Sequence, residues 1–90
     1  MGLNEADFKV LLKEGILSAE FGEHKEAIEN YDKAIKIMQN AEVYLNKGDS
    51  LVALESFKDA IENYDKAISF DPNDSLIWYN KGVALDDLEE

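Results

Sequence analysis

The chain of 90 residues contains no cysteine, one proline and a single histidine, His24. The absence of cysteine excludes disulfide bonds, thiolate metal sites and thiol catalysis. One histidine cannot form a His-based metal site within one chain, and no Ser-His-Asp arrangement is suggested. We therefore expect no metal, no cofactor and no enzymatic activity, and we expect His24 to be a partly buried turn residue.

Basic residues and long apolar runs are also scarce. Nine basic residues stand against twenty acidic ones, for a formal charge of −11. Such a surface repels phosphate backbones and anionic lipids, so nucleic acid and membranes are not expected as partners. No apolar run approaches the ~18–20 residues that span a bilayer, and the N-terminus lacks the basic and apolar regions of a signal peptide. The composition predicts a soluble, cytoplasmic protein; its charge favours basic partners or simply confers solubility.

An internal repeat is the main feature that the sequence does contain. The nine residues 27–35 recur unchanged as residues 60–68, at an offset of 33, and Asn46-Lys47-Gly48 recurs as residues 80–82, at an offset of 34. A chain with this period is built from stacked copies of one unit. Such units usually present a binding surface rather than a catalytic pocket.

The repeated unit is helical. Its apolar residues lie three and four positions apart, as on one face of an α-helix, and no strand pattern occurs. Asn40 is expected to cap the third helix, and Ser56 with Asp59 resembles a capping box for the fourth. We predict five helices, at residues 4–20, 24–38, 41–54, 57–70 and 74–88.

The second copy reads Tyr44-x₂-Lys47-Gly48-x₂-Leu51, followed by Ala60-x₃-Tyr64, Ala67 and Pro72. This pattern resembles the tetratricopeptide repeat, a helix–turn–helix unit of about 34 residues. The resemblance covers residues 8–90. It implies an all-α fold in which antiparallel helix–turn–helix repeats form a short right-handed solenoid. The single domain 1–90 would contain repeat one at residues 8–40, repeat two at 41–74 and a half repeat at 75–90.

Gly15, Gly48 and Gly82 lie inside predicted helices, where glycine costs ~1 kcal/mol relative to alanine. Close packing of two helix backbones must offset this cost. Ala27 and Ala60 are expected as the small residues on the facing helices. The aromatic residues expected to fill the core around these approaches are Tyr31, Tyr44, Tyr64 and Trp78.

In this family the first helices of successive repeats line a concave groove. The resemblance implies a non-catalytic protein–protein interaction module that binds a peptide or helix with apolar anchors and basic flanks. The groove positions carried over are Lys9, Leu12, Ile16, Ala19, Glu20, Glu42, Leu45, Asn46, Asp49, Val52, Ala53, Leu76, Tyr79, Asn80, Val83, Asp86 and Asp87. Some members grip acidic chaperone tails with a carboxylate clamp, but only Asn46 matches its five positions, so such binding is not expected.

Self-assembly is the alternative hypothesis. The third copy stops after its first helix, which leaves Trp78, Leu85 and Leu88 to pack against a helix that is absent. No proline or glycine interrupts residues 24–47, so the second and third helices could fuse into one and exchange between chains. The protein would then be a homo-oligomeric scaffold, or an excised or engineered piece of a longer array.

Overall fold

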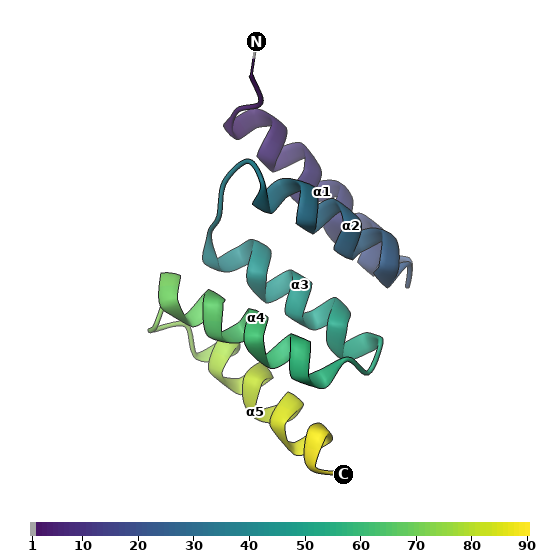
Figure 1. Cartoon of the computed structure of the whole chain (residues 1–90), viewed down its shortest axis with the longest axis vertical. Helices are drawn as coiled ribbons and strands as arrows, with labels where there is room; N and C mark the ends of the chain where they lie inside the picture. The colour runs from purple at the N-terminus through teal and green to yellow at the C-terminus, as the bar shows by residue number, and fades with distance from the viewer. Residues whose placement is uncertain (1) are drawn as a thin grey trace.

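A computed structural model describes residues 2–90 and shows five α-helices joined by short connections (Figure 1). No strand occurs in this part of the chain, and none of its helices is long and apolar enough to cross a membrane. The helices are α1 (Glu5–Glu20), α2 (His24–Ile35), α3 (Ala41–Ala53), α4 (Phe57–Phe70) and α5 (Ser75–Glu89).

The helices stack in chain order along the long axis of the molecule, with the two termini at opposite ends (Figure 1). Each helix packs mainly on its neighbours in sequence, and the stack measures 47 × 28 × 16 Å. The fold is therefore an all-α solenoid of helix–turn–helix repeats, as predicted.

The connection between α2 and α3 reverses the chain instead of fusing the two helices. The N–H groups of Ile37 and Met38 both donate to the carbonyl oxygen of Ala34, at 2.9 and 3.1 Å, which closes α2 early. The prediction that α2 extends to residue 38 is therefore wrong. Asn40 then caps α3 as predicted, because its Oδ1 accepts a 2.9 Å hydrogen bond from the N–H of Val43.

The capping box predicted at the start of α4 does not form. Ser56 has a ψ of 65°, far from the extended backbone of Asn40 (ψ 175°), and its side chain makes no cap hydrogen bond. A capping box that we did not predict begins α1. There Asn4 accepts from the N–H groups of Ala6 and Asp7, and Asp7 accepts from the N–H of Asn4.

One continuous core runs along the stack, and its glycine–tyrosine contacts confirm the predicted packing. A Cβ placed on Gly48 would lie only 2.5 Å from Cε1 of Tyr64, and one on Gly15 would overlap Tyr31 in the same way. Ala60, on the helix that faces Gly48, is fully buried. The buried apolar residues are Phe8, Leu12, Ala27, Tyr31, Ala34, Val43, Tyr44, Leu51, Ala60, Tyr64, Ala67, Ile77 and Ala84.

The junctions between repeats are equivalent. Lys47 on α3 forms an ion pair with Asp32 on α2, with Nζ 2.7 Å from Oδ1. Lys81 on α5 forms the same pair with Asp65 on α4, also at 2.7 Å. Helix α5 is thus placed against α4 as α3 is placed against α2.

The third repeat differs from the others on the side away from α4. Nothing lies within 4 Å of a Cβ placed on Gly82, and Trp78 is 49% exposed. The predictions that Gly82 allows a close approach of two helices and that Trp78 belongs to the core are therefore wrong, because no helix among residues 2–90 covers this face of α5.

Candidate ligand-binding surface

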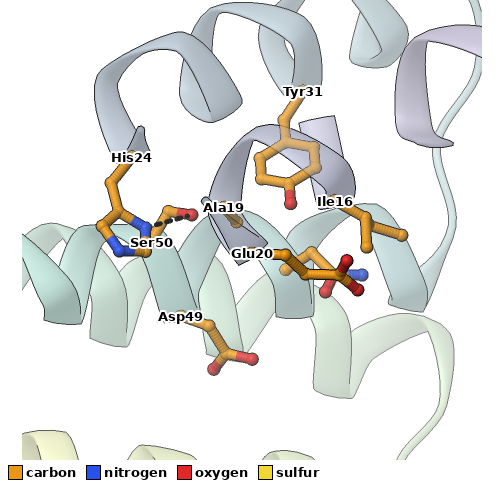
Figure 2. A pocket seen from close by; sticks show the side chains of 8 residues that line it. Ile16, Ala19, Glu20, His24, Tyr31, Asp49 and Ser50 are labelled. Carbon is orange, nitrogen blue, oxygen red and sulfur yellow. Dashed lines mark hydrogen bonds between the residues drawn. The ribbon is translucent and has the colours of Figure 1, made fainter. Parts of the chain in front are cut away.

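Two neighbouring hollows open between the first helices of the repeats. The first has a volume of about 310 Å³ and is lined by Ile16, Ala19, Glu20, His24, Tyr31, Asn46, Asp49 and Ser50 (Figure 2). The second has a volume of about 260 Å³ and is lined by Asp49, Val52, Tyr64, Tyr79, Asn80 and Val83. Asp49 on α3 belongs to both, so the two hollows adjoin.

Asp49 is the polar centre of the second hollow. Its Oδ1 accepts a 2.6 Å hydrogen bond from the hydroxyl of Tyr64 and a 3.0 Å bond from Nδ2 of Asn80. These bonds join α3, α4 and α5 at one oxygen. Oδ2 has no protein partner among residues 2–90, and Asp49 as a residue is exposed, so this second oxygen is accessible to a ligand.

The surroundings of Asp49 shift its pKa upward. Desolvation by the neighbouring side chains disfavours the ionised carboxylate, and the hydrogen bonds from Tyr64 and Asn80 only partly oppose this rise above 3.8. Burial and the adjacent Asp49 also raise the pKa of Tyr64, so its hydroxyl stays protonated and acts as a donor. The resulting arrangement presents one carboxylate oxygen, held in place by two donors, to the solvent.

The first hollow combines an apolar wall with acidic and hydroxyl groups. The ring of Tyr31 is in the core, but its hydroxyl points into the hollow above Glu20 (Figure 2). Burial raises the pKa of Tyr31 to about 12, and the negative charges of Asp49 and Glu20 add to the rise. The hollow is therefore a region of negative potential, which favours cations and hydrogen-bond donors.

His24 and Ser50 form one edge of the first hollow. The Nδ1 of His24, the first residue of α2, lies 3.3 Å from the Oγ of Ser50 on α3 (Figure 2). His24 is partly buried, as expected of a residue at this turn. Its contact with Ser50 joins the two repeats at the edge of the surface.

Most of the predicted groove residues line a hollow. The two hollows include Ile16, Asn46, Asp49, Val52, Tyr79, Asn80 and Val83. Glu42 and Leu45 line a third hollow of about 320 Å³ beside the starts of α3 and α5. None of the three hollows is lined by Lys9, Ala53, Leu76, Asp86 or Asp87. The Nζ of Lys9 instead lies 3.5 Å from Oε1 of Glu5 in an ion pair.

Leu12 requires a correction. Although it occupies a groove position of the family pattern, it is buried and belongs to the core. Leu12 shares the buried face of α1 with Phe8 and Gly15. Leu12 is therefore not accessible to a ligand.

Four residues of the hollows were not among the predicted groove residues: His24, Tyr31, Ser50 and Tyr64. Tyr31 and Tyr64 were assigned to the core, correctly for their rings, but a buried tyrosine usually places its hydroxyl where it can reach a hydrogen-bond partner. Nothing local indicates the contact of His24 with Ser50, which are 26 residues apart.

Comparisons with known families agree with this geometry. Residues 48–88 match the model described as TPR repeat, and residues 9–40 match the model described as tetratricopeptide repeat. The chain belongs to the tetratricopeptide repeat family. No curated protein sequence gives a significant match. Tetratricopeptide repeats generally act as protein-interaction modules, so the two hollows are candidate contact sites for another protein.

Proposed function

We propose that this tetratricopeptide repeat protein binds a peptide or helix across the two hollows, with apolar side chains seated between basic ones. The observation that carries the proposal is the position of Asp49. Its carboxylate lies in both hollows, is held by Tyr64 and Asn80 through Oδ1, and keeps Oδ2 open. A lysine or arginine of the ligand would form a charge-assisted hydrogen bond with this open oxygen.

Apolar contacts supply the anchors. Ile16 and Ala19 form the wall of the first hollow, and Val52 and Val83 form that of the second. All four belong to the first helices of repeats, so a ligand that crosses the stack would meet them in turn. Burial of ligand side chains on these walls provides affinity in proportion to the apolar area covered.

Charge supplies selectivity. Glu20 and Asp49 face the ligand, and the chain has a formal charge of −11, so a basic peptide is attracted and an acidic one is repelled. Binding should weaken as salt rises, because exposed charges are screened beyond a Debye length of about 8 Å at physiological ionic strength.

A selection from random displayed peptides of about twelve residues tests the proposal. We expect the bound pool to be enriched in sequences with apolar residues between lysine or arginine. The Asp49→Asn and Glu20→Gln variants should then bind a selected peptide about five- to tenfold more weakly by fluorescence anisotropy. Glu62→Gln removes the same charge from an exposed position of α4 and serves as the control.

Two results would overturn the proposal. One is a bound pool without basic enrichment; the other is an equal loss of affinity in the Glu62→Gln control. Tyr79→Asp adds a test of the apolar contact, since Tyr79 is exposed and lines the second hollow. It should abolish binding while the helical circular dichroism is retained.

A further inference from the structure

The last helix of the stack has an uncovered apolar face. Trp78, Gly82 and Leu85 lie along the side of α5 that is turned away from α4, with Leu88 beside them. Figure 1 shows α5 at the end of the stack. We call these four residues the α5 end face.

The same positions are covered in the preceding repeat. Tyr44 and Leu51 of α3 correspond to Trp78 and Leu85 at the offset of 34 residues. They are 4% and 9% exposed, whereas Trp78 and Leu85 are 49% and 39% exposed. The helix that covers α3 is α4, so the α5 end face lacks the counterpart of α4.

The two covering helices show what such a counterpart must look like. In α4, Tyr64 packs on Gly48 and Ala60 is fully buried; in α2, Tyr31 packs on its own facing glycine. Both helices carry the identical sequence Ala-Ile-Glu-Asn-Tyr-Asp-Lys-Ala-Ile. A helix that covers a face with a central glycine thus carries a small residue and, four positions later, a tyrosine. Gly82 retains the space for that tyrosine, because no atom lies within 4 Å of its Cβ position.

Charge also defines the counterpart. A helix that covers α5 as α4 covers α3 runs antiparallel to it, so its N-terminal turn lies beside the end of α5. This end of α5 carries four carboxylates and no basic residue. The positive end of a helix dipole and a lysine in the first turn, such as Lys58 of α4, are favoured there. The four acidic residues are Asp86, Asp87, Glu89 and Glu90.

We propose that the α5 end face is a docking site for an amphipathic helix of a partner protein that carries Ala-x₃-Tyr and a lysine in its first turn. A second copy of the chain fits less well. Its own Ala-x₃-Tyr helices are buried against α1 and α3. An antiparallel pair of α5 helices would bring the acidic end of one beside Asp71 and Asp74 at the start of the other.

A synthetic peptide with the sequence of residues 56–71 tests the docking site, because it carries Ala-x₃-Tyr, a lysine (Lys58) in its first turn and no tryptophan. Trp78 is the only tryptophan of the chain, so its emission reports directly on the α5 end face. We expect a saturable 1:1 blue shift of this emission as peptide is added. A peptide in which the tyrosine is replaced by aspartate should bind about tenfold more weakly or not at all.

Gly82→Leu is the matching change in the protein. It fills the space for the partner's tyrosine, and its Cβ has open space around it, so circular dichroism should show a folded protein. We expect binding of the peptide to fall by about tenfold. Leu76→Ala alters an exposed residue of α5 outside the end face and should leave binding unchanged. Asp49→Asn should also leave it unchanged, which separates this site from the hollows.

Three results would overturn the proposal. The first is no shift of the Trp78 emission up to about 1 mM peptide, the weak limit of specific binding. The second is equal binding by the Gly82→Leu variant, which would place the peptide elsewhere. The third is a dimer instead of the 10.2 kDa monomer in light scattering, with Trp78 emission that shifts with protein concentration; a second copy would then occupy the face.

Discussion

The hydroxyl of Tyr64 donates a 2.6 Å hydrogen bond to Oδ1 of Asp49, while the ring of the same tyrosine packs on Gly48. One side chain therefore joins the helix packing to the candidate binding surface. In the first repeat Tyr31 packs in the same way, but Ile16 stands where the second repeat has Asp49. The hydroxyl of Tyr31 consequently has no carboxylate at the equivalent position, which makes the two hollows chemically different.

Two substitutions of Asp49 should distinguish the contribution of its hydrogen bonds to stability from the contribution of its charge. Asp49→Asn keeps an oxygen that accepts from Tyr64 and Asn80 but removes a partly desolvated charge, so the free energy of unfolding at neutral pH should be unchanged or higher. Asp49→Ala removes the acceptor and should lower it by about 0.5–1.5 kcal/mol. Urea denaturation measures both. Equal destabilisation by the two variants would show that the carboxylate itself, rather than its hydrogen bonds, stabilises the fold.

The ionisation of Asp49 should also be visible in the pH dependence of the free energy of unfolding. Because the pKa of Asp49 is raised in the folded protein, its contribution is fully present below the ordinary value of 3.8 and is lost as pH rises through the folded value. The wild type should therefore gain more stability than Asp49→Asn as pH falls from about 7 to about 4. The general effect of the acidic surface is common to both proteins. Parallel pH curves would contradict the raised pKa.

Alanine at Gly48 and at Gly82 should have opposite effects. A methyl group on Gly48 would lie 2.5 Å from the ring of Tyr64, so Gly48→Ala should lower the free energy of unfolding by about 1–3 kcal/mol. Gly82 has open space, so Gly82→Ala should raise it by about 0.5–1 kcal/mol through helix propensity. Thermal unfolding provides the measurement. A destabilised Gly82→Ala protein would mean that something already covers α5.

The turn between the helices of each repeat offers a second matched pair. Gly22 and Glu55 occupy equivalent positions with φ of 79° and 61°, in the left-handed region that favours glycine. Glu55→Gly should raise the free energy of unfolding by about 1 kcal/mol, and Gly22→Ala should lower it by a similar amount. Chemical denaturation of the two variants checks both. If Glu55→Gly were destabilising, a contact of the Glu55 side chain would have to outweigh the backbone strain.

Removing the side chain at the N-cap should lower the stability of the protein at the start of α3 but not at the start of α4. Asn40→Ala removes the 2.9 Å bond from the N–H of Val43 and should cost about 0.5–2 kcal/mol. Ser56→Ala should change stability little, because Ser56 makes no cap bond. Melting temperatures of the two variants decide this. Equal losses would indicate that Ser56 caps α4 in solution.

Local features of the chain were sufficient to predict much of the fold. The spacing of apolar residues located all five helices, and the glycines predicted the contacts of Tyr31 and Tyr64. The end of α2 was missed because it depends on how Ile37 and Met38 share the carbonyl of Ala34. The cap at Ser56 was missed for a similar reason, since a cap requires a backbone conformation as well as a suitable residue.

The candidate binding surface was predictable only in outline. The family pattern located Asp49 and Asn80, but their hydrogen bond joins residues 31 positions apart. The contact of His24 with Ser50 also joins two repeats. Such contacts depend on how α2, α3 and α5 are placed relative to one another, which no periodicity within a single helix encodes.

The chain's own pattern thus specifies a stack of helical repeats, because helix periodicity and the fit of tyrosine to glycine act between neighbouring segments. Accessibility follows instead from what covers each helix. Tyr44 and Trp78 occupy the same position of the repeat, yet Tyr44 lies beneath α4 and Trp78 is open to solvent. Burial depends on the next element in space, so only the assembled helices distinguish a core aromatic residue from one that is free to meet a partner.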